Sequence, residues 1–256
     1  SLTGGGIYVE NVVSEEQKIF ASDGEASDYF GSSGAIEGNY AIIGAYRDDD
    51  GGSDAGAAYI YFYDGTSWTE QAKLVASDAS VNANFGYSVS LSGDYAIVGA
   101  RSAPDGGGVS TGAAYVFLRT GTSWTEQAKL LPADGALGDQ FGADVSISGD
   151  YALIGSHFDD DQGSGSGSAY VFLRTGTRWA QQAKLNGSNA FTNSAFGGAV
   201  SLSGDYALIG ARRGSGSGTA YIFLRSGTSW AEQAAFSAPD AGTSSDFGVS
   251  VSLDGD

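Results

Sequence analysis

The segment that decides the fold runs from Phe141 to Leu185. It contains, in order, the pair Phe141-Gly142, the alternating stretch 143–148, the pair Gly149-Asp150, the apolar stretch 151–155, a Gly/Ser loop, the stretch 169–173, the turn 175–177 and the stretch 179–185. The same order recurs along the chain, with its Phe-Gly pair at Phe30, Phe85, Phe141, Phe196 and Phe247. The intervals are 55, 56, 55 and 51 residues, a period typical of propellers and other repeat arrays. Residues present in every copy are therefore expected to be structural, and function is expected where the copies differ.

Each copy contains four short segments with strand patterning and almost nothing with a helical period. In the second copy, residues 86–92 alternate apolar residues with serines. Gly93-Asp94 then forms a two-residue hairpin turn, because Gly and Asp tolerate the positive φ that such turns require. Residues 95–100 are almost continuously apolar, as expected of a strand that is buried on both faces. Four antiparallel strands per unit match the blade of a β-propeller.

The two ends of the chain carry parts of a fifth copy. Residues 4–10 and 15–20 have the pattern of third and fourth strands, and residues 247–256 have the pattern of a first strand that stops at its hairpin turn. We therefore expect an all-β fold, a single β-propeller domain over residues 1–256, with about five four-stranded blades. In this arrangement, residues 4–22 complete the blade that begins at Phe247, so the last blade is shared between the N- and C-termini.

The fifth copy lacks the apolar second strand of the repeat. Three explanations stay open. The natural chain continues past Asp256, or the chain belongs to a longer tandem array that forms a larger ring, or another copy donates the strand. An unpaired sheet edge is adhesive, and donation of a strand is a known way to fill it.

Composition and charge exclude several classes of protein. Hydrophobic residues make up 41% of the chain, enough for a core, and cysteine is absent, which excludes disulfides and thiolate metal sites. The net charge is −18, from 12 basic and 30 acidic residues. Nucleic acid and anionic membrane surfaces are poor partners for such a chain, because phosphate binding needs clustered positive charge. Since no apolar run reaches about 18 residues, we expect no membrane insertion.

The Phe-Gly pair, followed by an alternating strand and an apolar strand that ends in Gly-Ala, resembles the FG-GAP repeat, the blade unit of the integrin alpha-chain propeller. Four copies are in register, namely Phe30 with Gly44-Ala45, Phe85 with Gly99-Ala100, Phe141 with Gly155-Ser156, and Phe196 with Gly210-Ala211. The segments Ala-Tyr-Val-Phe and Trp-x-Glu-Gln-x-Lys-Leu make the chain more similar to the bacterial branch of the family. The resemblance covers nearly the whole chain and implies adhesion as the biological setting.

One departure from the family concerns calcium. Integrin-type repeats place an Asp-rich calcium loop between the Phe-Gly strand and the Gly-Ala strand. The connection in this chain is only a pair such as Gly93-Asp94. A two-residue turn is too short to surround a cation that takes about 6–8 oxygen ligands. The resemblance therefore implies no calcium at the family's position.

The loop after each apolar second strand varies most between the copies. Asp48, Asp50 and Asp54 have the D-x-D-G-x-x-D spacing of a short calcium loop, in which glycine permits the sharp turn. Asp159 and Asp161 form a weaker version of the same pattern. Ca²⁺ is therefore the candidate cofactor of this chain. The alternative is an Asp-rich turn whose carboxylates are solvated.

Two other recurring features favour a structural interpretation. Acidic residues precede the Phe-Gly pairs at Asp23, Asp28, Asp78, Asp134, Asp139 and Asp240. Because they recur, we expect these residues to cap turns by accepting hydrogen bonds from backbone amides, with metal binding as the alternative. Tryptophan occupies one repeat position, at Trp68, Trp124, Trp179 and Trp230, where blade packing explains the recurrence better than stacking on sugars does.

Nothing in the sequence supplies a catalytic constellation. His157 is the only histidine and cysteine is absent, so nucleophilic triads have little basis, and no carboxylate pair stands out for glycoside hydrolysis. We therefore expect a non-catalytic extracellular or cell-surface propeller that binds a protein or a glycan. One alternative is a structural subunit of a surface filament or layer, in which copies of the chain assemble by strand complementation. The other alternative is a glycan-active enzyme.

Overall fold

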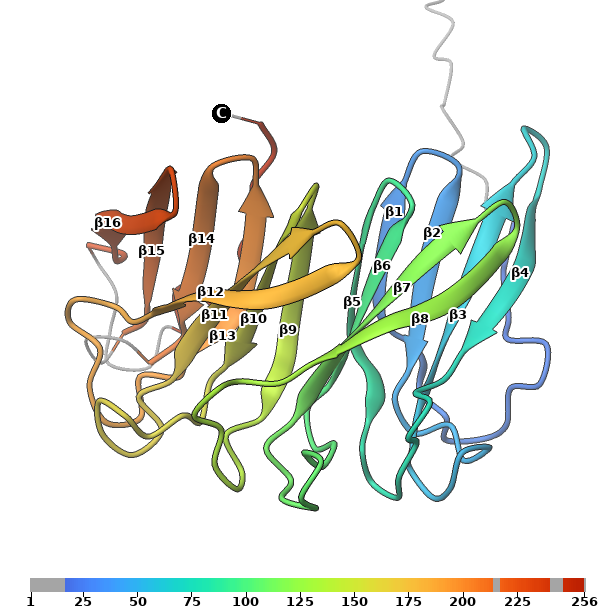
Figure 1. The fold of residues 1–256 in the computed structure, drawn as a ribbon, viewed down its shortest axis with the longest axis horizontal. Coiled ribbons are helices and arrows are strands. Elements are labelled where there is room, and N and C mark those ends of the chain that lie inside the picture. The colour runs from blue at the N-terminus through green and yellow to red at the C-terminus, as the bar shows by residue number, and fades with distance from the viewer. Residues whose placement is uncertain (1–16, 214–216, 240–245, 256) are drawn as a thin grey trace, which may run out of the picture.

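The computed structural model describes residues 17–213, 217–239 and 246–255. These residues form four antiparallel sheets, each of four strands that pair in chain order, and the sheets follow one another along the chain (Figure 1). The strands are β1 (Phe30–Glu37), β2 (Tyr40–Ala45), β3 (Ala57–Tyr63), β4 (Trp68–Leu74), β5 (Phe85–Ser92), β6 (Tyr95–Ala100), β7 (Ala113–Thr120), β8 (Ser123–Leu130), β9 (Phe141–Ser148), β10 (Tyr151–Ser156), β11 (Ser168–Thr175), β12 (Arg178–Leu185), β13 (Phe196–Ser203), β14 (Tyr206–Ala211), β15 (Thr219–Ser226) and β16 (Ser229–Phe236). The all-β, propeller-like prediction is confirmed. Among the described residues there is no helix that is long and apolar enough to cross a membrane.

The glycines of the repeat lie where neighbouring sheets approach each other most closely. Gly86 has a φ of +86°, in the region that side-chain-bearing residues avoid. Its carbonyl oxygen lies so close to Gly44 on β2 of the preceding sheet that a Cβ there would overlap it. Glycines on the second strands of the other three sheets meet the next Phe-Gly segment in the same way, at Gly99, Gly155 and Gly210. Both glycines of the repeat are thus required by backbone-to-backbone contact between sheets.

Small residues on the first strands allow those strands to converge. The Oγ of Ser90 accepts a hydrogen bond from the Ile147 amide of the next sheet at 3.2 Å, and Ser146 accepts one from Leu202 at 3.0 Å. A cavity of about 330 Å³ is lined by residues of β1, β5, β9 and β13 together with residues 249–251. We call it the central cavity. The first strands therefore surround one common space, as expected of a propeller-like arrangement.

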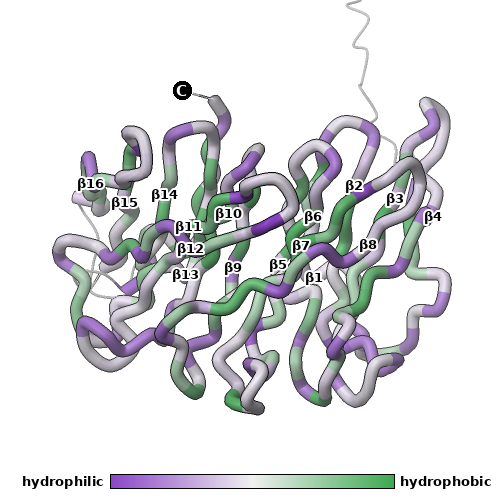
Figure 2. Tube along the Cα trace, in the orientation of Figure 1, coloured by the Kyte–Doolittle hydropathy of each residue, from purple (hydrophilic) through white to green (hydrophobic). Residues whose placement is uncertain are grey.

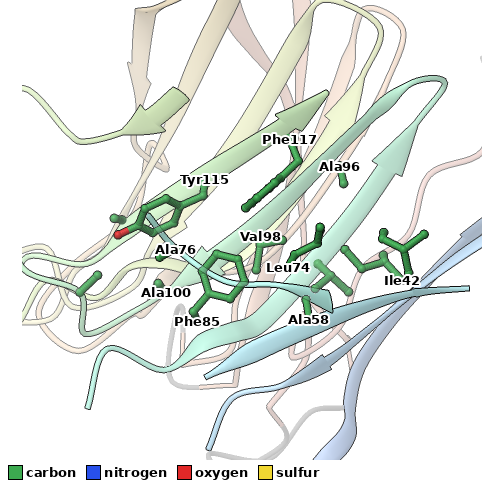
Figure 3. Packing of buried hydrophobic residues seen from close by; sticks show 14 of the residues in the cluster. Ile42, Ala58, Leu74, Ala76, Phe85, Ala96, Val98, Ala100, Tyr115 and Phe117 are labelled. Carbon is green, nitrogen blue, oxygen red and sulfur yellow. The ribbon is translucent and has the colours of Figure 1, made fainter. Parts of the chain in front are cut away.

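Apolar side chains fill the space between successive sheets. Figure 3 shows the cluster between the first two sheets, where Ile42 and Ala58 meet Phe85 and Tyr115. The Phe85 ring packs edge-on against Tyr115, with ring centroids 5.4 Å apart. Similar clusters lie between the second and third sheets and between the third and fourth. In Figure 2 the hydrophobic stretches follow the strands.

The predicted count of five blades differs from the structure, which has four sheets in its described part. Residues 246–255, which cover most of the predicted first strand at 247–256, make one bridge between Phe247 and Gly218 and form no strand. The physical reason is that no described strand pairs with this segment to form a ladder. Residues 4–16, predicted to supply further strands, lie outside the described residues, and residues 17–22 form no strand.

Residues 246–255 nevertheless take the place of a first strand beside β13. The Leu253 amide donates to Ser201 Oγ at 2.9 Å, repeating the serine contacts between the other first strands. A Cβ on Gly210 would overlap the carbonyl oxygen of Gly248, as at the other sheet contacts. The segment thus repeats the docking of a first strand without its sheet.

Residues 17–22 lie against the first sheet. The Gln17 side-chain amide donates to the Trp68 carbonyl at 2.8 Å and accepts from the Trp68 amide at 2.7 Å. Ser22 binds the Glu70 carboxylate through its amide and hydroxyl at 2.9 and 2.8 Å, as Ser77 binds Glu126 in the next sheet. This segment therefore contacts the first sheet as the linker after β4 contacts the second.

Candidate functional site

The variable loops gather at one edge of the four sheets, at the bottom of Figure 1. They join second strands to third strands and span residues 46–56, 101–112, 157–167 and 212–218, of which 214–216 lie outside the described residues. The Phe-Gly pairs lie at the same edge, because each first strand runs antiparallel to its second strand. We call this surface the lower edge. It is where the repeats differ most.

Two of the three residues in the first predicted calcium loop gather around a lysine. The Lys73 ammonium lies 2.9 Å from the Asp48 carboxylate, 2.5 Å from Asp50 and 2.7 Å from Asp23. Oxygens of these three carboxylates lie within 4.8 Å of one another. The Tyr59 hydroxyl is 2.7 Å from Asp48 and 2.8 Å from Asp23. The ammonium therefore occupies the position among the carboxylates that a cation would take.

Asp54, the third residue of that predicted loop, is not part of the acidic group formed by the other two. Its carboxylate lies 3.9 Å from Arg47 Nε, and its amide donates to Asp49 Oδ1 at 2.7 Å. The spacing of the loop therefore brings Asp48 and Asp50 together but leaves Asp54 apart from them.

The third loop repeats the lysine-centred arrangement. The Lys184 ammonium lies 2.9 Å from Asp159 and 2.8 Å from Asp134, and it also contacts Asp161. The Tyr170 hydroxyl is 2.8 Å from the buried Asp159 carboxylate. Both predicted ligands of this loop therefore bind the same ammonium.

The pKa shifts follow from the lysine-carboxylate contacts in these clusters, in each of which one ammonium faces three carboxylates. Burial alone would raise the pKa of the Asp23 and Asp134 carboxyls, but hydrogen bonds from the lysines and tyrosines hold both below their usual values. Burial works against the charge of Lys73, yet the surrounding carboxylates raise the pKa of its ammonium. Burial and the neighbouring carboxylates raise the pKa of Tyr59, so its hydroxyl stays protonated.

The other two repeats show that lysine and aspartate vary together. In the second repeat, Lys129 binds Asp78 at 2.6 Å and the Pro104 carbonyl at 2.7 Å. In the fourth repeat, Ala235 pairs with Tyr221 where the other repeats have lysine, and Asn189 accepts from the Tyr221 hydroxyl where they have aspartate. This joint loss is the sequence signal that could have identified the clusters, and sequence reasoning missed it.

The second acidic loop caps turns at two positions. Asp28 accepts the Glu25 amide at 2.5 Å, and Asp139 accepts the Ala136 amide at 2.7 Å. Both side chains are buried. The capping interpretation is confirmed for these two residues, whereas the first-position aspartates in the described residues bind lysine. Asp240 lies outside the described residues.

Three of the four tryptophans join neighbouring sheets through their indole nitrogens. Trp124 donates to Gln71 at 3.1 Å, Trp179 to Gln127 at 2.9 Å and Trp230 to Gln182 at 3.0 Å. Each indole also packs against the apolar cluster between its own sheet and a neighbour. The packing interpretation is confirmed for these tryptophans.

The position directly after each second strand has a large polar residue in every repeat. The four residues are Tyr46, Arg101, His157 and Arg212. Tyr46 lies between Tyr29 and Tyr87, with ring centroids 5.2 and 5.3 Å away. The Arg101 guanidinium lies 3.7 Å above the Tyr87 ring. A row of aromatic rings therefore leads along the lower edge to Arg101.

A cavity of about 240 Å³ opens where Arg101, His157 and Arg212 converge, with Tyr87 and Gln140 in its wall. We call it the basic pocket. The rest of its described lining is Ala143, Phe158, Gly198, Gly248 and Val249. No carboxylate is among these residues. The pocket adjoins the central cavity, since several small residues line both. Sequence reasoning singled out His157 but missed the two arginines at equivalent positions.

Comparison with known families decides what kind of repeat this is. A family model described as the FG-GAP repeat matches residues 13–61, 68–117, 124–172 and 179–223. The chain belongs to the FG-GAP repeat family. The resemblance drawn from the Phe-Gly pairs is thereby confirmed. No curated protein matches the chain.

Each of the last three FG-GAP matches begins at a fourth strand and ends in the third strand of the next sheet. One FG-GAP unit therefore spans the contact between two sheets, where the glycines and tryptophans described above lie. These glycines and tryptophans are the same in each unit, and they hold neighbouring sheets together. The lower-edge residues differ between the FG-GAP units, which makes that edge the candidate functional surface.

Proposed function

We propose that this FG-GAP protein is a non-catalytic, extracellular or cell-surface binding module of the adhesion type, which presents its lower edge to a protein or a glycan. The observation that carries the proposal is the concentration at this edge of arginines without an ion pair and of exposed aromatic side chains. In the described part of the chain, Arg101 and Arg212 have no ion pair, and the Tyr29 and Phe158 side chains are 50% and 41% exposed. The contacts that repeat between the sheets do not involve these groups, so a ligand is their natural partner.

The arrangement of the acidic groups supports a non-catalytic role. A general acid or base needs a carboxylate that can exchange a proton with substrate. The best-grouped carboxylates instead surround Lys73 and Lys184. Calcium at these loops stays a prediction. In each cluster an ammonium group already supplies one positive charge.

Binding to glycan and protein arrays tests the proposal. We expect discrete hits with the wild-type protein, and we expect them to be lost when Tyr46 and Arg101 are replaced together by Ala and Gln. A matched control is Asn39→Ala, in the hairpin between β1 and β2 at the opposite edge. Hits that survive the lower-edge variant but not the control would contradict the proposal, as would turnover of a bound polysaccharide.

A second candidate function is assembly by strand complementation, because the first sheet has an open apolar groove. The groove has a volume of about 360 Å³ and is lined in part by Ile19, Ala35, Ile43 and Trp68. Ile36 also lines it and is 67% exposed. A strand donated by another copy would cover this groove.

The mass of the native particle tests this second candidate. Discrete particles of one chain indicate that the chain itself covers the groove. Ordered polymers that dissociate when Ile36 is replaced by Asp indicate that a neighbouring copy covers it. Discrete particles with the same mass in wild type and I36D would exclude assembly through this groove.

A further inference from the structure

The basic pocket concentrates positive charge at the lower edge, in a chain whose net charge is −18. Two guanidinium groups, Arg101 and Arg212, converge on it from equivalent positions of the second and fourth repeats. The single histidine of the chain, His157, enters it from the third repeat. Because the chain as a whole is negatively charged, these cationic side chains locally reverse the sign of its electrostatic field.

The two arginines differ from the paired cations in the described residues. Lys73, Lys129 and Lys184 hold carboxylates, and so do Arg119, Arg174 and Arg225. Arg101 and Arg212 have no ion pair in the described part of the chain, and the Nε atom of each is buried without a hydrogen-bond partner. Arg119, Arg174 and Arg225 also leave Nε without a partner, but their terminal nitrogens bind aspartates.

The pKa of His157 is affected by the charges of the two arginines. Its Nδ1 is buried without a hydrogen-bond partner, and its ring lies 4.2 Å from the Phe158 ring. Burial and then the charges of Arg212 and Arg101 lower the pKa of this imidazole to about 4. It is therefore neutral at pH 7 and leaves the two arginines as the charges that face the cavity.

Two carboxylates that line adjoining cavities have other partners. Asp144 lines the adjoining central cavity, where its two carboxylate oxygens accept the Val145 and Val200 amides at 3.0 and 2.7 Å. Asp54 lines a neighbouring hollow beside Arg101, but its ion pair is with Arg47 at 3.9 Å. The described lining of the pocket therefore has two guanidinium groups and no carboxylate to pair with them.

We propose that the basic pocket binds one compact oxyanion, a carboxylate, sulfate or phosphate group carried by the ligand. Guanidinium groups match the oxygens of all three groups in a bidentate manner, and such charge-assisted hydrogen bonds are the strong ones. The cavity of about 240 Å³ has glycine and alanine in its lining, which leaves room for a compact anion. This inference rests on the proposed function, which it extends by naming the binding position and the chemical class that it accepts.

The single histidine makes the test direct. Acetate, sulfate and phosphate are titrated separately into the intact protein at constant ionic strength in a low-chloride buffer, and the His157 imidazole signal is followed by NMR across pH. A bound anion offsets the arginine charges, so we expect saturable shifts and a higher pKa for His157. The order of the three affinities distinguishes a planar carboxylate from a tetrahedral sulfate or phosphate.

A matched pair of variants separates the pocket from the general charge of the loop. Arg212→Gln removes one guanidinium from the pocket, and Arg213→Gln removes an exposed one from the adjacent position. Because a hydrogen bond to a charged group is strong, we expect R212Q to weaken anion binding about tenfold or more and R213Q to leave it within about twofold. Arg101→Gln is a second pocket variant, for which we expect the same loss.

Two results would overturn the inference. One is the absence of saturable shifts at His157 with any of the three anions in the wild-type protein. The other is an equal loss of affinity in R212Q and R213Q, which indicates diffuse attraction. If array binding at the lower edge persists while the anions fail to bind, the proposed function stands and this inference fails. If the anions bind while no array hit exists, the proposed function fails.

Discussion

Replacing Lys73 by Met removes the ammonium from its three carboxylates but keeps the apolar stem of the side chain. The Asp48 side chain is only 4% exposed, so its charge loses a partner that water cannot replace. Removing one partner of a buried ion pair costs about 3–5 kcal/mol. Since Asp50 is 68% exposed, we expect the lower end of that range, about 3 kcal/mol. For a domain of this size, that loss lowers the Tm by roughly 6–12 °C.

The pH dependence of this loss follows from the lowered pKa of Asp23. A carboxyl whose pKa is lower in the folded state contributes stability above its unfolded pKa of about 3.9, and this stability is lost as the pH falls through the folded value. The repulsion among carboxylates in K73M also disappears when they are protonated. We therefore expect the Tm difference between wild type and K73M to shrink as the pH falls from about 7 to about 3.

The assay is thermal unfolding followed by circular dichroism, with and without millimolar Ca²⁺. In K73M the three carboxylates are left without their ammonium, so added Ca²⁺ is expected to raise the Tm of K73M more than that of the wild type. Arg178→Met, which removes an exposed cation from β12, is the charge-matched control. A K73M variant that is no less stable than R178M would contradict this prediction, as would Ca²⁺ that stabilises the wild type as much as K73M.

Three further predictions concern the contacts between sheets and are all measured by chemical denaturation. Gly99→Ala places a Cβ against the Gly142 carbonyl oxygen and is expected to lower the free energy of unfolding by at least about 2 kcal/mol. The control Gly106→Ala, whose Cβ meets nothing, is expected to change it by no more than about 0.5 kcal/mol. Equal effects of the two substitutions would contradict the close approach of the sheets. Ser90→Ala leaves the Ile147 amide without its acceptor and is expected to lower the free energy of unfolding by about 1 kcal/mol. An unchanged denaturation midpoint would show that this serine contact does not stabilise the fold. Burial raises the pKa of Asp144 to about 6 despite two backbone hydrogen bonds, so its ionised form opposes folding above that pH. Asp144→Asn is therefore expected to gain stability relative to wild type between pH 4 and pH 7, and a difference that does not change with pH would contradict this assignment.

Local sequence pattern was sufficient for the elements of the fold. The turn at Gly93-Asp94 and the apolar run 95–100 correspond to the observed hairpin and to β6 (Tyr95–Ala100). Both are decided by φ preferences and by burial on two faces, which neighbouring residues alone express. The Phe247-Gly248 pair shows the limit of such patterns. The segment docks beside β13 through Leu253, yet a strand also needs a paired neighbour, which its own pattern does not supply.

The candidate site was predicted less well, because its contacts join residues that are far apart in the chain. The calcium spacing grouped Asp48 with Asp50 and Asp54, all within one loop. The structure instead groups Asp48 and Asp50 with Asp23 from the preceding linker and with Lys73 from β4. Only the register of β3 against β4, in which Tyr59 pairs with Lys73, brings the ammonium to that place. The same reason explains why the arginines of the basic pocket were missed.

The most direct test of the account is chemical-shift mapping with a ligand selected from the arrays. Backbone amide signals of the isotope-labelled protein are compared with and without that ligand. We expect the largest changes at the lower edge, at Arg101, His157 and Arg212 and along the row of tyrosines. Changes concentrated in the hairpins of the opposite edge, at Gly38, Gly93, Gly149 and Gly204, would contradict this expectation, because the ligand would then bind where the repeats are alike.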